Sequence, residues 1–277
     1  MSFLSKSDMQ VIALLFVAVF LAPGCSEEGP TIPEISATPD YENIWPAAVG
    51  NQWEFELFNK IYVSEERPYD SLDDIPELRT MEELYADLQG EDWGEHTSVA
   101  RGVFNLVFAE GASNSEGTSM LLSNSREDIE GKPFPPSPLW LGDVWLQKSE
   151  RISYSVFGWM SWLHLQGDLS PGNEFSYEVP AMVESHLYNR IWEIRPSTVL
   201  GKKYRNCLEV FYLFDMGIQT IRDENNEVEG YYNQYGYGVV VYAPEVGPVF
   251  FQERIMMSPG LWEHRKATLM AFESGGN

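Results

Sequence analysis

The chain has 277 residues, of which 42 are Asp or Glu and 18 are Lys or Arg, so its formal net charge is −24. A charge of this sign repels nucleic acid and anionic membrane surfaces, which makes both poor candidate partners for the folded part of the chain. The acidity fits a solvated, soluble surface, or a surface that binds cations or basic partners.

An uninterrupted apolar run near the N-terminus, Val11–Ala22, leads to Pro23, Gly24 and Cys25. It is shorter than the roughly 20 residues of a membrane-spanning helix, but it has the length of the apolar core of a secretory signal. The stretch LAPGC resembles the lipobox of bacterial lipoproteins, in which a small residue precedes the lipidated cysteine. The resemblance implies a signal peptide over residues 1–24 and a lipid anchor on Cys25. An ordinary cleaved signal with an incidental cysteine is the alternative.

The residue after the cysteine, Ser26, bears on location. In the Gram-negative families that this motif resembles, Asp at that position retains a lipoprotein at the inner membrane. Ser26 therefore implies an outer-membrane lipoprotein, facing the periplasm or the cell surface, or a membrane-anchored extracellular protein if there is no outer membrane. We expect residues 25–44, which are polar and rich in proline, to be a disordered tether. Residues 45–273 should then form a single β-rich domain, followed by a disordered tail over residues 274–277.

The second of the two cysteines, Cys207, has no partner if Cys25 is lipidated, which excludes a disulfide framework. It lies among Leu208, Val210 and Phe211. This setting predicts a buried small hydrophobic residue and not a nucleophile.

Two copies of the pattern P-x-x-x-G-[ND]-x-W occur, at residues 46–53 and 138–145. The Gly-Asn and Gly-Asp pairs, which start at Gly50 and Gly142, tolerate positive φ and favour a tight turn. Trp53 and Trp145 then follow at the start of a strand. We predict that each tryptophan fills the core where its strand begins.

One segment, Asp73–Leu88, has apolar residues at spacings of three and four and is the best helix candidate. Thr80 and Glu83 have the spacing of a capping box, and Gly90 is suited to end the helix. We expect one helix or a broken pair that covers the sheet or its open edge.

The remaining chain is typical of short strands separated by turns. The expected fold class is mainly β, a curved antiparallel sheet forming a half-barrel or barrel-like meander, with one or two short helices. After an aromatic strand that runs through Val63, the expected strands are Val99–Ala109, Thr118–Leu122, Val144–Tyr154, Trp159–Leu165, Glu174–Val179, Val183–Ile194, Asn206–Leu213, Gln219–Ile221, Val239–Tyr242, Val249–Met256 and Lys266–Phe272.

Three stretches resemble bacterial surface lipoproteins of unassigned function. Residues 200–210 are similar to their "aGtFkNCLkV" stretch, residues 242–249, which contain Gly247, to "WYAPGVGLV", and residues 49–53 to "VGNxW". The chain departs from this family in having Glu245 where the family has Gly, and in a longer middle section. The resemblance implies a curved antiparallel sheet, loosely similar to lipoprotein-carrier folds, and brings no catalytic residues with it.

Motifs for metal, phosphate or nucleophilic chemistry are absent from the sequence. The four histidines, at 96, 164, 186 and 264, are isolated, which favours structural or surface roles. Residues 223–230 alternate oxygen donors as a Ca²⁺ loop does. They lack the Gly at position six and the distal Glu of an EF-hand, so an acidic hairpin turn is favoured. We predict no catalytic residue, no metal site and no cofactor.

The most informative apolar stretch is Val156–Leu163. A strand exposed on one face alternates apolar and polar residues, whereas this one carries Phe157 and Trp159 on one face and Met160 and Trp162 on the other. Such a strand either is packed between a sheet and a helix or lines an apolar cavity. These four residues are the candidate ligand-lining residues.

Three functional hypotheses remain open. The first is a lipid-anchored, non-catalytic envelope protein that binds an apolar or lipid ligand on a concave aromatic face. The second is a structural or assembly lipoprotein that presents its acidic surface to envelope partners. The third, an envelope hydrolase, would need converging carboxylates or a Ser–His pair in a cleft.

Overall fold

The computed structural model describes residues 32–46, 48–90, 96–114, 117–128, 151–156, 160–178 and 185–275. Side-chain surroundings are described for most of these residues, but not for residues 96–100, 104, 109–128 or 151–164. The chain divides into two units at Ile32 and Pro33, and the second unit contains the fold described below. The predicted signal peptide and Cys25 lie outside the described residues.

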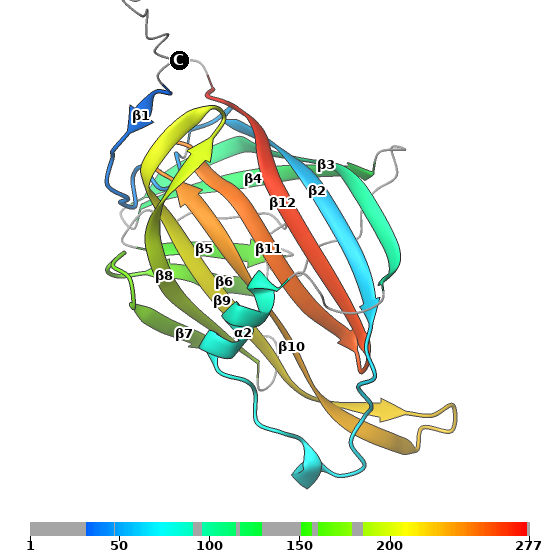
Figure 1. The fold of residues 1–277 in the computed structure, drawn as a ribbon. Coiled ribbons are helices and arrows are strands. Elements are labelled where there is room, and N and C mark those ends of the chain that lie inside the picture. The colour runs from blue at the N-terminus through cyan, green and yellow to red at the C-terminus, as the bar shows by residue number, and fades with distance from the viewer. Residues whose placement is uncertain are drawn as a thin grey trace, which may run out of the picture. The chain divides into compact units, whose positions relative to one another are not determined.

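A ten-stranded sheet dominates the second unit (Figure 1). Its strand order is β4-β3-β2-β12-β11-β10-β9-β8-β7, with β1 beside β9, while β5 and β6 form a separate pair. The strands are β1 (Glu34–Ile35), β2 (Gln52–Val63), β3 (His96–Asn114), β4 (Gly117–Asp128), β5 (Arg151–Val156), β6 (Met160–Gln166), β7 (Glu174–Glu178), β8 (His186–Val199), β9 (Lys202–Arg222), β10 (Val228–Ala243), β11 (Gly247–Ser258) and β12 (Leu261–Glu273).

Neighbouring strands of the sheet are antiparallel, except for the parallel pair β1 and β9. Within the described residues β4 and β7 are the two edges, so the sheet is open. The prediction of a mainly β chain built on an antiparallel sheet is confirmed. From β8 to β12 the strands follow one another through short connections: two residues join β8 to β9 and β11 to β12, three join β10 to β11, and five join β9 to β10.

Strand lengths differ from those predicted. The expected strands 206–213 and 219–221 are parts of the single strand β9, and the expected strand 239–242 is only the end of β10. The glycines in the first part of β10 are atypical of a strand, so the sequence did not predict a strand there. At Gly238, packing explains why the residue is a glycine. A Cβ atom there would lie 2.5 Å from the hydroxyl oxygen of Tyr212, whose side chain crosses the glycine.

The helix α2 (Met81–Gln89) begins at the capping box that the sequence predicts, within the expected helical segment Asp73–Leu88. Thr80 accepts a hydrogen bond from the Glu83 backbone N–H, and the Glu83 carboxylate accepts one from the Thr80 backbone N–H, so the capping box is present. The predicted helical residues before Thr80 instead form the short 3₁₀ helix η1 (Leu72–Asp74) and an extended stretch. Pro76 accounts for this break, because proline disfavours helical geometry in the residue before it.

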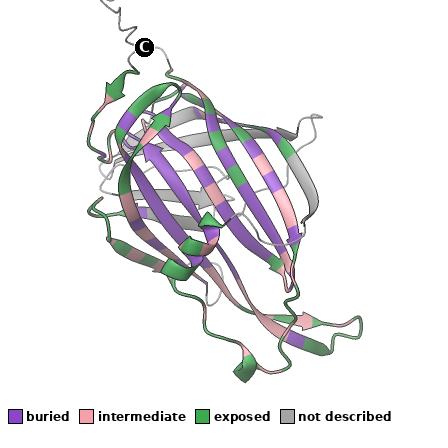
Figure 2. Ribbon diagram, viewed as in Figure 1, coloured by how far each residue is buried: buried purple, intermediate pink, exposed green. Residues whose placement is uncertain are grey.

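The central strands are buried on both faces, as Figure 2 shows along β9, β10 and β11. The helix-bearing face carries Phe211, Tyr237, Val239 and Trp262, packed with Leu84 and Leu88 of α2. The opposite face holds the larger core, whose strand residues include Phe55, Tyr212, Val240, Phe251 and Ala267. Alternation along each strand sends neighbouring side chains to these two faces.

Residues 33–45 lie along the sheet and are ordered by it. β1 pairs with Lys203 and Tyr204 of β9, beyond the end of β10. The side chains of Ile44 and Trp45 are 0% and 1% exposed. This differs from the tether expected over residues 25–44, because the last part of that range already belongs to the folded unit.

Candidate functional site

Three of the residues singled out in the sequence meet at one corner of the larger core. Gly50 has φ +90° in the turn before β2, and Gly247 has φ +97° at the start of β11. The Trp53 indole N–H donates a 2.5 Å hydrogen bond to the Val246 carbonyl. A Cβ atom on Gly247 would lie 3.3 Å from that indole nitrogen. Gly50 therefore permits the turn before β2, and Gly247 permits the close approach of Trp53 at the start of β11. These roles are structural.

Helix α2 is held on the sheet by a partly buried polar cluster. Asp87 accepts hydrogen bonds from Tyr237 on β10 and from the Arg254 guanidinium on β11. Arg254 also donates a 3.0 Å hydrogen bond to the Tyr237 hydroxyl. Burial opposes ionisation of Asp87, but Tyr237 and the two guanidinium groups nearby outweigh it and lower the pKa of this carboxyl. The cluster fixes the position of α2, and a pocket lies at each end of the helix.

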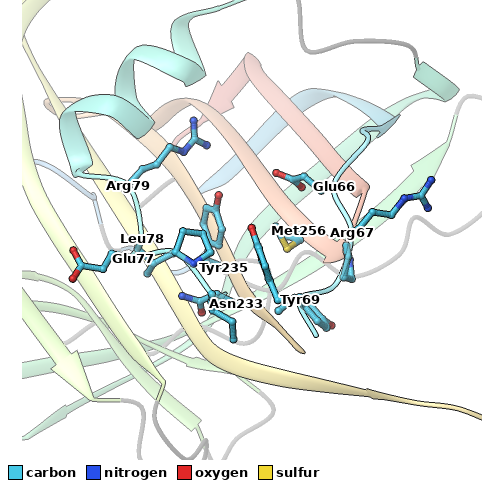
Figure 3. Close-up of a pocket in the computed structure, with 13 residues that line it drawn as sticks. Glu66, Arg67, Tyr69, Glu77, Leu78, Arg79, Asn233, Tyr235 and Met256 are labelled. Carbon is cyan, nitrogen blue, oxygen red and sulfur yellow. The ribbon is translucent and has the colours of Figure 1, made fainter. Parts of the chain in front are cut away.

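The first pocket, of about 230 Å³, lies before the N-terminus of α2 (Figure 3). One wall is the crossover segment, residues 64–80, which links β2 to α2. The other wall comes from β10 and β11. Apolar and aromatic groups make up most of the lining, namely Tyr69, Ile75, Pro76, Leu78, Tyr232, Tyr235, Met256 and Pro259. We call this the apolar pocket.

Hydrogen bonds from three residues, Ser64, Glu66 and Tyr69, attach the crossover segment to the strands and turn beside it. Tyr69 and Tyr231 exchange backbone hydrogen bonds of 2.8 and 2.9 Å, and the Ser64 N–H donates to the Gly260 carbonyl at 2.8 Å. Glu66 accepts a 2.7 Å hydrogen bond from the Trp262 indole. Figure 3 shows Tyr69 and Leu78 of the segment near Tyr235, Asn233 and Met256 of the strands, whereas the Arg67 and Glu77 side chains extend outward. The remaining charged lining residues are Arg67, Glu77 and Arg79.

The second pocket, of about 460 Å³, lies beside the C-terminal end of α2, where Leu88, Gln89 and Gly90 contribute to its lining. Its floor is the helix-bearing face of β10, β11, β12 and β2. Among the described residues, its lining contains four basic or imidazole side chains and no acidic one. We call it the basic pocket, and those four residues are Lys60, Arg195, His264 and Lys266.

His264 is the most deeply buried of the four, with 6% exposure. Burial is the main cause that lowers the pKa of its imidazole to about 3, and the positive charges of Arg254, Lys60 and Lys266 lower it further. The imidazole is therefore neutral near pH 7, while the lysines beside it carry charge. The potential in the basic pocket is positive.

A row of polar side chains crosses the opposite face inside the core. Arg265 bridges Glu253 at 3.5 Å and Glu263 at 2.5 Å. Tyr212 donates a 2.8 Å hydrogen bond to Glu253, and Asn59 donates a 2.5 Å hydrogen bond to Glu263. Each of these residues is no more than 7% exposed, so the row is a buried hydrogen-bonded network that substrates do not reach.

The candidate ligand-lining residues of the sequence analysis are mostly not located. Phe157 and Trp159 lie outside the described residues, as do Gly142 and Trp145. Met160 and Trp162 lie on β6, but their side chains are outside the described part. The predicted concave aromatic face therefore stays a prediction.

Two smaller predictions can be checked directly. Cys207 is fully buried, and burial raises the pKa of its thiol to about 11, as expected for a packing residue. Residues Asp223–Glu227 form the β9–β10 turn, in which the Asp223 carboxylate accepts hydrogen bonds from the backbone N–H groups of Asn225 and Glu227. The sequence analysis favoured this acidic turn over a calcium loop.

Sequence reasoning missed both pockets. Their lining comes from segments as distant as Lys60 and Lys266, and each basic residue alone is unremarkable in a strand. One usable signal exists in the run His264-Arg265-Lys266, where strand alternation places His264 and Lys266 on one face and Arg265 on the other.

Within the described residues, no group of three or more His, Cys, Asp or Glu side chains is arranged to hold a metal ion. In that same part of the chain, no helix has the length and apolar character needed to cross a membrane.

Comparison with known proteins gives limited results. No protein-family model matches the chain, and no curated protein matches it. A candidate exported protein with a YmcC-like fold from Bacteroides fragilis has 13% identity, a TM-score of 0.40, and coverage of 84% of this chain and 99% of its own. A candidate lipoprotein from Parabacteroides distasonis has 12% identity, a TM-score of 0.36, and coverage of 83% and 98%. At these scores neither structure defines the fold or the function of this chain.

Proposed function

We propose that the protein is an exported, lipid-anchored envelope protein that binds a small apolar ligand and has no catalytic role. The anchor is Cys25, at the outer membrane where the organism has one. The binding site is the apolar pocket. The observation that supports binding is its aromatic and aliphatic lining, with charged groups only at a few positions, which is the usual composition of a ligand site.

The size of the apolar pocket limits the ligand. At about 230 Å³ it is smaller than the roughly 300–1,000 Å³ typical of sites for drug-sized molecules. It suits a short apolar group, such as the end of an acyl chain or one ring. Arg67 and Arg79 at the lining can hold a polar end of such a ligand.

Uptake of a neutral apolar dye tests this binding. The protein is secreted from Ser26 onward behind an ordinary signal peptide and titrated with N-phenyl-1-naphthylamine, whose fluorescence rises in apolar surroundings. Ile75→Trp places a large side chain in the pocket and should lower dye affinity several-fold. Leu72→Trp, on the same segment but 52% exposed, is the matched control and should bind the dye normally. Equal dye affinity in both variants would contradict the proposal.

The anchor is tested separately by labelling cells with an alkyne analogue of palmitate. The unchanged protein should carry the label and sediment with membranes, and Cys25→Ser should lose the label. Cys207→Ser removes the other cysteine and should keep it. Labelled Cys25→Ser protein would show that Cys25 is not the lipid attachment site.

A second candidate function, presenting an acidic surface to an envelope partner, is favoured by the β9–β10 hairpin. Its outer part extends beyond the pairing with β8, which ends at Asp215, and with β11, which begins at Gly236 (Figure 1). The turn at its tip carries Asp223, Glu224 and Glu227. Crosslinking in membranes should recover a basic partner in a salt-sensitive way, and the loss of that partner on replacing all three acids with Gln would assign the contact to the tip.

A further inference from the structure

The basic pocket contains two cations without a carboxylate nearby. Among the described residues, neither Lys60 nor Lys266 has a carboxylate oxygen within 4.0 Å, whereas Arg79, Arg190, Arg195, Lys203, Arg205, Arg254 and Arg265 all form ion pairs. With 42 acidic residues in the chain, an acidic neighbour would be easy to provide. Arg67, Lys202 and Arg222 form no ion pair among the described residues either, but Lys60 and Lys266 line one pocket together.

The sheet register holds the two lysines close together. Lys60 on β2 lies opposite His264 on β12, and Lys266 lies opposite Phe58. The lysines are therefore diagonal neighbours on adjacent strands, with Cα atoms about 7–8 Å apart. Like charges at this separation repel each other, and an anion placed between them would remove that cost.

Aromatic rings restrain both ammonium groups. The Lys60 Nζ atom lies 5.2 Å from the centre of the Phe58 ring and 5.9 Å from that of Tyr62. The Lys266 Nζ atom lies 5.4 Å from the centre of the Phe250 ring. Contacts of this kind reduce the freedom of the lysines without neutralising them, so their charges stay available to a ligand.

The other polar groups of the basic pocket do not supply a competing anion. Arg195 is bound to Glu209 at 2.5 Å and to Glu193 at 3.4 Å, so its charge is already balanced. The helix end nearby is partly neutralised, because Gln252 donates a 2.9 Å hydrogen bond to the Leu88 carbonyl. The uncompensated charge is thus that of the two lysines.

We propose that the basic pocket binds a phosphate-bearing organic molecule, with the phosphate between Lys60 and Lys266. A phosphate monoester carries a charge close to −2 at pH 7, which matches two ammonium groups. The remaining volume and the Phe58 and Tyr62 side chains accommodate the organic part. This site is separate from the apolar pocket and does not depend on its function.

Calorimetric titration of the full chain in a non-ionic detergent tests the site. Glycerol 3-phosphate serves as a free organic phosphate and dihexanoyl phosphatidic acid as a lipid headgroup, with dihexanoyl phosphatidylcholine as the zwitterionic comparison. Binding of either phosphate monoester supports the site, and the tighter of the two identifies its source as a free molecule or a lipid. Failure of both to bind would overturn the proposal.

Charge-removing variants locate the binding. Lys60→Gln combined with Lys266→Gln should weaken phosphate binding at least tenfold. Lys202→Gln, at an exposed lysine that begins β9, makes the same kind of charge change elsewhere and should leave it unaltered. Lys266→Arg keeps the charge and should retain most of the affinity, which separates lost charge from lost folding. Unchanged phosphate affinity in the double variant would overturn the assignment of the phosphate to Lys60 and Lys266. Unchanged dye uptake by the double variant would show that the apolar pocket is independent of the basic pocket.

Discussion

At the scale of single residues, Glu245 occupies a position that suits glycine. Its φ is 68°, in the left-handed region, and its side chain is exposed. The backbone N–H of Glu245 donates a 2.7 Å hydrogen bond to the Asn43 carbonyl, which holds this conformation in place. The lipoproteins that the sequence resembles carry Gly at this position, and the backbone geometry gives the physical reason.

Replacing Glu245 with Gly should therefore stabilise the protein. A non-glycine residue in the left-handed region costs roughly 1–2 kcal/mol, and the greater freedom of Gly in the unfolded chain cancels part of the gain. We expect the free energy of unfolding to rise by about 0.5–1 kcal/mol, measured by urea denaturation. Glu245→Ala is the control, since it removes the same carboxylate and keeps the Cβ atom. A destabilised Gly variant would contradict the strain argument.

His264 should make stability depend on pH in mildly acidic solution. Its folded pKa is about 3, below the ordinary value of 6.5, so the unfolded chain takes up a proton at a pH where the folded protein does not. The associated stability is complete above pH 6.5 and is lost as pH falls toward 3. At pH 5 the loss should be about 2 kcal/mol relative to pH 7.

The matching variant is His264→Gln, which cannot take up this proton. Between pH 7 and pH 5 its free energy of unfolding should change less than that of the unchanged protein, measured by urea denaturation at each pH. The lowered carboxyl pKa values, such as that of Glu34 at about 2, act below this window and do not interfere. Parallel pH dependences of the two proteins would show that His264 takes up its proton in the folded state as well.

Residue-level roles were predictable where they depend on local chain geometry. Gly50 and Thr80 could be recognised because a turn and a helix cap are specified by residues a few positions apart. Lys60 could not, because its significance depends on Phe58 and His264, and His264 reaches it only through the sheet register. A single sequence does not contain that register explicitly.

At the scale of elements, α2 has little length to stabilise itself. A helix of nine residues is marginal alone, so it depends on packing and on its polar attachment to the sheet. Asp87 and Arg254, which make this attachment, are 167 positions apart. The capping box could therefore be predicted from the sequence, while the docking of the helix could not.

Asp87→Ala should weaken this attachment strongly. It leaves the Arg254 side chain, 9% exposed, without its carboxylate, and removing one partner of a buried pair costs about 3–5 kcal/mol. Because Asp87 itself is 24% exposed, we expect a loss of about 2–3 kcal/mol in the free energy of unfolding. Glu82→Ala breaks the more exposed pair with Arg190 and should cost clearly less, because solvent screens that pair. Equal losses of unfolding free energy in the two variants would contradict the conclusion that the Asp87–Arg254 pair is a buried attachment of α2.

The length of the strands was harder to predict than their presence. β9 has 21 residues, and its outer half alternates exposed and half-buried side chains, which resembles a turn region when read alone. β10 begins with the tyrosine, glycine and asparagine residues of the projecting hairpin. The strand cores, by contrast, are continuous apolar runs buried on both faces, and those runs were identified.

At the scale of the whole molecule, the sequence predicted a mainly β fold because that depends on composition and alternation. The sequence did not predict which side chains meet on each face of the sheet, and both pockets depend on those meetings. The apolar and basic pockets lie at opposite ends of one helix on one face, so a single ligand class need not explain both. The two sets of variants proposed above separate them.

The short strand β1 has a further consequence for a chain anchored through Cys25. Only eight residues lie between Cys25 and Glu34, and the nine chain steps from one to the other reach at most roughly 30 Å. The start of β9 beside β1 would then stand close to the lipid surface, with Lys202 exposed there and Lys203 and Arg205 paired with Glu34 of β1. A cation such as Lys202 is attracted to anionic headgroups. The two-residue strand β1 would thus determine which end of this acidic protein faces the bilayer.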